Sequence, residues 1–192
     1  MVGTAILAAI VILLQAFVVI PLGAFTITLT LVPIIIGAII YGPKAGSFLG
    51  GVFGVTVAIQ VVTGALGVLS FKMFEVHPVL TIALCILKGV MAGLISGLIW
   101  AAFKNTKNKT IGVILSSVAC PIVNTGIFVG GLFAFYYGLM ADFASQSDFA
   151  SAVAFIFIGI VGLNFLVEFA INVALIPVIL RLIAVLIPKK KA

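Results

Sequence analysis

Long apolar segments, separated by short groups of polar residues, glycine and proline, occupy almost the whole chain. Most of them approach the roughly 20 apolar residues that an α-helix needs to cross the hydrocarbon core of a bilayer. We therefore expect an all-α integral membrane protein, a bundle of six transmembrane helices forming a single domain over residues 1–192. The predicted helices cover residues 2–21, 30–42, 44–64, 78–103, 110–138 and 152–187.

The segment PLGAFTITLTLVP, residues 21–33, departs from the helical pattern. Polar and apolar residues alternate from residue 24 to residue 30, which is the period of an extended strand. We expect an extended outer loop between the first two helices, lying as a cover across the outer face. The loops at 64–78 and 140–152 would complete this lid. The second helix is short and contains Pro33, so an incomplete or kinked span is expected.

The composition supports a membrane protein, with 65% hydrophobic and 7% charged residues and a mean hydropathy of +1.50. The formal net charge of +6 does not indicate nucleic-acid binding, because the lysines stand between or after apolar segments without interleaved aromatic residues. Cytoplasmic loops of membrane proteins carry an excess of lysine and arginine. Lys44, the KNTKNK loop at 104–109 and the PKKK tail at 188–191 therefore predict both termini on the cytoplasmic side of a bacterial plasma membrane.

Glycines recur every four residues in two segments, at Gly42, Gly46, Gly50 and Gly54 and again at Gly89, Gly93 and Gly97. Small residues at this spacing let two helices approach closely in lipid. We interpret both series as ordinary packing within the bundle. Gly126 and Gly130 should likewise let neighbouring helices approach the fifth helix.

Enzymatic motifs are missing from the sequence. One histidine is present, and there are no paired carboxylates on facing helices, no HExxH and no phosphate-binding glycine loop. Cys85 and Cys120 lie in apolar runs without the spacing of metal ligands. We expect neither catalysis nor a cofactor nor a bound metal.

Polar side chains inside the predicted helices are few, and a charge at the helix centre costs roughly 2.5–3.5 kcal/mol. Lys88 lies about 15 Å from the outer end of its helix at 1.5 Å per residue. Asn164, Glu168 and Asn172 share one face of the last helix at i, i+4 and i+8. Asn124 follows Pro121, which should kink the fifth helix. The full set is Gln15, Gln60, Lys88, Asn124, Asn164, Glu168 and Asn172.

Two interpretations of these polar residues remain open. They can line a polar pocket reached from outside, in which Lys88 meets an anionic group of a ligand. Alternatively, Lys88 and Glu168 form a buried ion pair while the asparagines hold helices together. Both can hold at once, with Glu168 and Asn172 in a structural role.

The order of elements at the N-terminus resembles the substrate-binding (S) component of energy-coupling-factor vitamin transporters. The resemblance comprises the AxxxA step of Ala5 and Ala9 in TAILAAI, the extended outer loop, and LVPIIIGAIIYGPKAGSFLGGVFG. It implies a subunit that binds a vitamin from outside under a lid. Such a subunit docks on a transmembrane coupling subunit with two cytoplasmic ATPases and topples to release its substrate inside. By matching position, Ala5 and Ala9 would contact the coupling subunit.

The segment CPIVNTGIF in the fifth helix resembles pantothenate-type members of that family. Asn124 would then bind a hydroxyl or amide of the substrate, and Lys88 would face its carboxylate. Folate, riboflavin or another vitamin are alternatives, and a stand-alone proton-coupled carrier with Glu168 as relay is the alternative from another class. The candidate substrate-binding residues are Lys88, Asn124, Thr125, Asn164, Tyr136 and Thr28.

Overall fold

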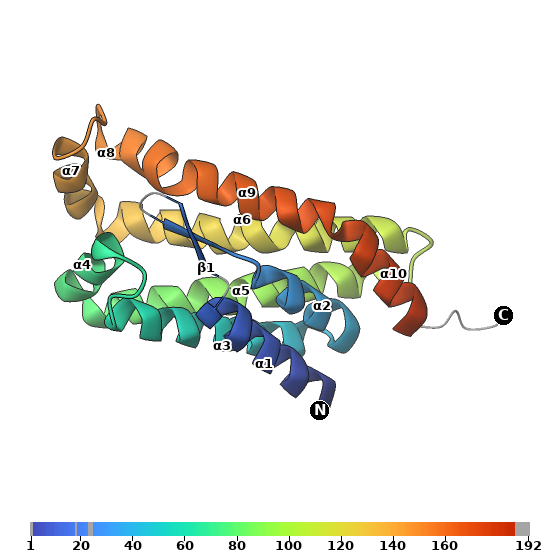
Figure 1. The fold of residues 1–192 in the computed structure, drawn as a ribbon. Helices are drawn as coiled ribbons and strands as arrows, with labels where there is room; N and C mark the ends of the chain where they lie inside the picture. The colour runs from blue at the N-terminus through green and yellow to red at the C-terminus, as the bar shows by residue number, and fades with distance from the viewer. Residues whose placement is uncertain (1, 18, 23–24, 187–192) are drawn as a thin grey trace.

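The helical bundle in Figure 1 is a computed structural model, which describes residues 2–17, 19–22 and 25–186. Most of the chain forms helices along one common direction, and two short strands lie beside them. The elements are α1 (Val2–Phe17), β1 (Val19–Leu22), β2 (Phe25–Thr28), α2 (Leu31–Tyr41), α3 (Pro43–Val62), α4 (Val68–Val76), α5 (Pro78–Phe103), α6 (Lys109–Phe135), α7 (Tyr137–Ser145), α8 (Ala152–Ala154), the π-helix η1 (Phe155–Gly162), α9 (Leu163–Ala174) and α10 (Ile176–Leu186).

Four helical stretches in the described part of the chain are long and apolar enough to cross a membrane. They are Pro43–Val62, Pro78–Phe103, Lys109–Phe135 and Ala152–Ile183. The remaining apolar helices, α1 and α2, are shorter. With 11 residues, α2 rises only about 16 Å, roughly half of the hydrocarbon core. The short second helix expected from the sequence is confirmed.

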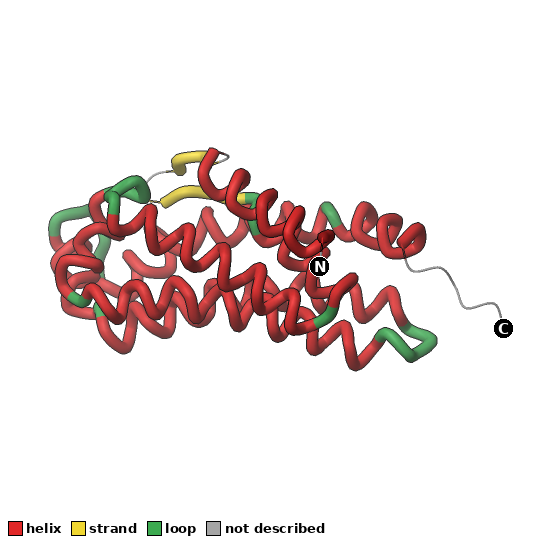
Figure 2. Tube along the Cα trace, turned by 90° about the horizontal axis from the view of Figure 1, so that it is seen from below, coloured by secondary structure: helices red, strands yellow, loops and turns green. Residues whose placement is uncertain are grey.

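The extended segment after α1 is an antiparallel hairpin in which Val19 pairs with Thr28 and Leu22 with Phe25. Helix α1 therefore ends at Phe17, and its predicted extension to residue 21 was wrong. Pairing between the strands satisfies backbone N–H and C=O groups that an apolar surrounding cannot. β1 lies next to α1 and β2 next to α9. Figure 2 shows both strands on one side of the bundle.

Two of the predicted loops contain helices that the hydrophobic pattern did not indicate. α4 lies within the predicted loop at 64–78, where Lys72 and Glu75 form a salt bridge of 2.6 Å one turn apart. α7 occupies much of the loop at 140–152, and α6 ends at Phe135 instead of residue 138. Short helices stabilised by side-chain pairs three or four residues apart need no long apolar run. A search for membrane-spanning segments therefore misses them.

The last helical run is interrupted, which corrects the prediction of one helix over 152–187. It begins with α8 and the π-helix η1, and a turn at Leu175 separates α9 from α10. Pro177 has no N–H to donate to a carbonyl of the preceding turn, and proline is well tolerated at the start of a helix. The chain therefore ends α9 and begins α10 just before Pro177. Pro121, by contrast, lies within α6, which continues through it.

The predicted close packing is confirmed for most of the glycine series, between α3 and α5, but not for Gly42, which has no atom of the described residues within 4 Å of an added Cβ. A Cβ added at Gly50 would overlap the Gly89 carbonyl oxygen, and one at Gly46 would overlap that of Gly93. Gly54 lies against the Cys85 backbone in the same way. The two helices thus meet backbone to backbone, which only residues without a side chain permit.

Gly126 and Gly130 do not pack as expected. Within the described part of the chain, no atom of a neighbouring element lies within 4 Å of a Cβ built at either position. Gly131 instead meets the Leu84 side chain. The close contact of α6 is therefore made by the helix face that contains Gly131, and not by the predicted face of Gly126 and Gly130.

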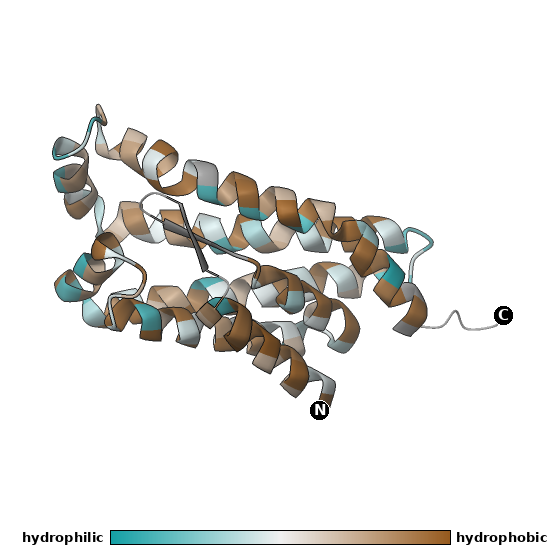
Figure 3. Cartoon of the chain, in the orientation of Figure 1, coloured by the Kyte–Doolittle hydropathy of each residue, from teal (hydrophilic) through white to brown (hydrophobic). Residues whose placement is uncertain are grey.

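Charged segments gather at the two ends of the bundle. The start of α1, the α2–α3 corner, the loop at 104–108 and the end of α10 lie toward one end, whereas α4 and α7 lie at the other (Figure 1). The hydropathy colouring in Figure 3 shows mainly apolar residues along the long helices, with a few hydrophilic positions inside them. These internal positions are where a ligand site can form.

Replacement of Gly50 by alanine should destabilise the protein, because the new methyl group overlaps the Gly89 carbonyl. Overpacking typically costs about 1–3 kcal/mol. Thermal unfolding of the purified protein in detergent measures the effect. Gly126→Ala, where the methyl group meets open space, is the matched control. An unfolding midpoint equal to wild type for Gly50→Ala would contradict the backbone contact.

Candidate ligand-binding site

A pocket lies between the α3–α5 pair and the facing helices α6, η1 and α9, with further walls from α1 and α4. The space between its lining atoms is about 890 Å³, a volume that includes solvent at the open side of the pocket. Its polar lining residues are Gln15, Ser70, Thr81, Cys85, Lys88, Asn124, Thr125, Asn164 and Glu168. Polar side chains thus make up about half of the lining, and they can fix the orientation of a ligand.

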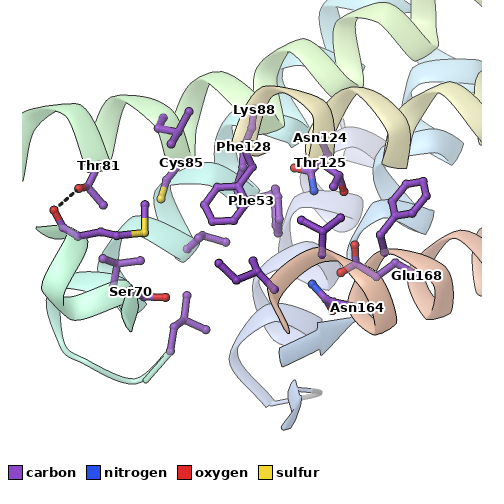
Figure 4. Close-up of a pocket in the computed structure, with 18 of the residues that line it drawn as sticks. Phe53, Ser70, Thr81, Cys85, Lys88, Asn124, Thr125, Phe128, Asn164 and Glu168 are labelled. Carbon is purple, nitrogen blue, oxygen red and sulfur yellow. Dashed lines mark hydrogen bonds between the residues drawn. The ribbon is translucent and has the colours of Figure 1, made fainter. Parts of the chain in front are cut away.

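Most of the residues predicted to bind substrate meet in this pocket. Lys88 comes from α5, Asn124 and Thr125 from α6, and Asn164 from α9. Glu168, one turn after Asn164, lines it as well. Figure 4 shows the side chains of α6 and α9 on opposite sides of the cavity. The pocket therefore brings together polar groups that are about 80 residues apart in the sequence.

The Lys88 ammonium lies against two aromatic rings. Its Nζ is 4.8 Å from the centre of the Phe128 ring and 5.8 Å from that of Phe53. Among the described residues, the recorded salt bridge joins Lys72 to Glu75 and does not involve Lys88. A ring face attracts a cation without neutralising its charge. The rings therefore hold Lys88 in the pocket as a positive group that can meet an anion.

Two amide oxygens in the pocket lack partners. Asn124 is only 7% exposed. Its Oδ1 and that of Asn164 are buried without a hydrogen bond among the described residues. An unsatisfied buried polar atom costs about 1–3 kcal/mol. A ligand bearing hydroxyl or N–H groups would remove this cost, so both amides are suited to ligand contact.

Asn172 lies one turn below Glu168 and outside the pocket lining. Its Nδ2 donates to the Glu168 backbone carbonyl at 2.7 Å, and the side chain is buried. The hydrogen bond runs within α9, so Asn172 acts on its own helix. This placement fits the structural role expected for it.

Tyr136 is not brought to the pocket. It is 1% exposed and lies at the corner between α6 and α7. Its hydroxyl is 2.7 Å from Thr81 Oγ1, and Thr81 Oγ1 lies 2.9 Å from the carbonyl oxygens of both Met73 and His77. Either hydroxyl can donate in the Thr81–Tyr136 hydrogen bond, and the Tyr136 hydroxyl also donates to the His77 carbonyl at 3.3 Å. Tyr136 therefore holds Thr81, a lining residue, by a hydrogen bond from outside the pocket lining.

The remaining predicted residues are Thr28, Ala5 and Ala9. Thr28 ends strand β2, but its side chain is outside the described residues. Ala5 and Ala9 are exposed on α1. They form a strip of small residues on the outside of the bundle, available to another membrane protein.

Sequence reasoning missed several lining residues. Gln15 was recognisable as a polar residue within an apolar run, but nothing placed it near Lys88. Phe53, Phe128 and Phe165 also line the pocket. With 16 phenylalanines in the chain, no sequence signal separates these three from residues of the core. Only their positions on facing helices do so.

The family model described as "ECF transporter, substrate-specific component" matches residues 1–180. The chain belongs to this family. A comparison with curated proteins gave no match. The protein is thus a substrate-binding subunit of an energy-coupling-factor transporter, a membrane transport component and not an enzyme. The pocket described above is the candidate site for the substrate of this component.

Proposed function

We propose that this component captures pantothenate from outside a bacterial cell and delivers it to a coupling subunit driven by two cytoplasmic ATPases. The observation that carries the choice of an anionic vitamin is Lys88, a cation held inside the pocket by Phe53 and Phe128. A positive group at this depth repels thiamine, which is a cation, and attracts a carboxylate.

The remaining lining groups suit a small acid with further polar groups. Pantothenate carries a carboxylate, an amide and two hydroxyls. Its hydroxyl and N–H groups can donate to the unpartnered oxygens of Asn124 and Asn164. The lining also includes aromatic rings, which would suit the ring systems of folate or riboflavin. Phe53 and Phe128 contact Lys88, however, and this use of the rings favours the smaller acid.

The proposed orientation has six membrane-inserted helices with both termini in the cytoplasm. Lys44, Lys104 and Lys107 belong to the end of the bundle where α1 starts and α10 finishes. The positive-inside rule assigns that end to the cytoplasm. The opposite end, with α4 and α7, then faces outward, and these helices together with the hairpin form the lid over the pocket.

The proposed contact with the coupling subunit is the exposed strip of Ala5 and Ala9 on α1. Small residues on a lipid-facing helix let a second membrane helix approach closely. The assignment rests on their match to the AxxxA step of the family. Energy would come from the ATPases of the assembly.

Lys88→Met should weaken pantothenate binding at least about thirty-fold, because loss of one partner of a buried charge pair costs 2 kcal/mol or more. Equilibrium binding of radiolabelled pantothenate to the purified component measures this. Lys72→Met, which changes an exposed lysine on α4, should leave affinity unchanged. Competition by folate and riboflavin is measured in parallel. Wild-type protein that binds one of these and not pantothenate would overturn the substrate assignment.

Asn124→Leu should also weaken pantothenate binding, by about tenfold, because it removes a hydrogen-bond acceptor from the pocket. Ser117→Ala is the matched control, since Ser117 is a fully buried residue of α6 with an unpartnered oxygen but does not line the pocket. Binding is compared together with thermal unfolding. Equal affinity for Asn124→Leu and wild type would show that Asn124 serves helix packing only.

The chain alone should bind pantothenate without accumulating it. Proteoliposomes containing only this component should show no uptake driven by a pH gradient, whereas addition of the coupling subunit and ATPases with ATP should produce uptake. Glu168→Gln separates the alternatives further, because it should not abolish the ATP-driven transport. Uptake by the chain alone that depends on a pH gradient and on Glu168 would support the proton-coupled carrier.

A further inference from the structure

A hydrogen-bond network at the outer end of α1 includes a residue of the pocket wall. Gln15 Nε2 donates to Gln60 Oε1 at 2.8 Å, and Gln60 Nε2 donates to the Gln15 backbone carbonyl at 2.8 Å. Thr30 Oγ1 donates to Gln15 Oε1 at 2.9 Å. The network joins α1, α3 and the start of α2. Of its three members only Gln15 lines the pocket.

The network fixes the Gln15 amide but does not use all of its hydrogen-bonding capacity. A glutamine amide has two N–H donors and an oxygen with two lone pairs. Gln60 and Thr30 take one donor and one lone pair. They also determine which amide atom is nitrogen and which is oxygen, because Gln60 Nε2 is oriented by the Gln15 carbonyl. Among the residues that the structure describes, no partner takes the second N–H or the second lone pair, which are therefore available to a group in the pocket.

Gln15 and Lys88 lie at different depths. Lys88 is positioned over Phe53, and Gln15 is bonded to Gln60, which is seven residues further along α3. Seven residues of helix correspond to about 10 Å. A ligand that reaches both groups must therefore be elongated, with its carboxylate at the inner level and a neutral polar group at the outer level.

We propose that Gln15 is a specificity-determining residue, which hydrogen-bonds the neutral end of the ligand while Lys88 binds the carboxylate. The inference rests on the proposed function and adds to it the position of the second end of the substrate. In pantothenate that end is the terminal hydroxyl, at the far end of the extended chain from the carboxylate. Because Gln15 belongs to α1, the ligand also stabilises the packing of α1 against α3.

A merely structural Gln15 would behave differently from a ligand-binding one. Gln60→Leu removes the reciprocal partner of Gln15 and leaves the pocket lining in place, so it reports on the network alone. Gln15→Leu removes both the network and the pocket amide. The comparison of the two variants separates the roles, provided that both affinity and thermal unfolding are measured.

The test combines these variants with a change in the ligand. Wild type, Gln15→Leu and Gln60→Leu are titrated with pantothenate and with its analogue lacking the terminal hydroxyl. Gln15→Leu should bind pantothenate about tenfold more weakly than wild type and should bind the deoxy analogue as wild type does. Gln60→Leu should unfold at a lower temperature than wild type. It should discriminate between pantothenate and the deoxy analogue as strongly as wild type does. If Gln15→Leu loses affinity equally for pantothenate and for the deoxy analogue, the inference is overturned, even when Lys88→Met confirms the proposed function.

A second measurement needs no ligand and keeps the two proposals distinguishable. In a background of Cys85→Ala and Cys120→Ala, Gln15→Cys places a thiol in the pocket wall and Ser117→Cys places one at a buried position of α6 outside the pocket lining. Hydrophilic methanethiosulfonate reagents should label Gln15→Cys faster, because the pocket is open to solvent. If wild type binds no pantothenate, the substrate assignment fails. If Gln15→Cys also labels no faster than Ser117→Cys, the assignment of Gln15 to the pocket fails as well.

Discussion

Hydrocarbon offers no hydrogen-bond partner, so every polar atom within this bundle must find one in the protein or in a bound molecule. The backbone meets this requirement through helices and, next to α1, through a paired hairpin. Several side chains meet it through specific partners, such as Gln15 with Gln60 and Thr30. The amide oxygens of Asn124 and Asn164 remain without partners among the described residues. Unpartnered oxygens also occur outside the pocket, on Ser116, Ser117 and Asn172, but those of Asn124 and Asn164 belong to residues that line it.

The pocket depends on an unequal packing of the helices. α3 and α5 touch backbone to backbone through their glycines and form a rigid wall. On the facing side, α6 and α9 carry the amides, and η1 interrupts the regular α-helical hydrogen bonding before α9. Figure 1 shows these two helices running side by side above α5. α6 also packs against α5, where Gly131 meets Leu84 and Ser96 donates to the Ser116 carbonyl, and the cavity lies between this assembly and the helices η1 and α9.

Helix α1 combines two surfaces that the proposed transport cycle needs. Its inner face bears Gln15, tied to α3 by a reciprocal pair of hydrogen bonds. Its outer face bears Ala5 and Ala9, which remain exposed. A ligand held by Gln15 strengthens the attachment of α1 to the bundle. The helix proposed to contact the coupling subunit would then differ in stability between the empty and the loaded component.

Apolar run lengths and glycine spacing were sufficient to predict most of the long helices, the short second helix and close helix packing at the glycines, because these depend on local geometry and on the cost of exposing polar groups to lipid. They did not show that the two glycine series face each other. Isolated polar residues in apolar runs also indicated Lys88, Asn124 and Asn164 as pocket residues. The hydrophobic pattern could not show α4 and α7, which bury too little apolar surface to leave a signal.

Only the tertiary structure decided which residues share the pocket. It placed Phe53 and Phe128 against Lys88, brought Gln15 into the same pocket, and put Tyr136 outside the pocket lining, in contact with Thr81. It also turned Gly126 and Gly130 toward open space. These outcomes depend on how each helix is rotated against its neighbours. That rotation is set by the sum of many side-chain contacts between distant segments, which no local pattern of residues encodes.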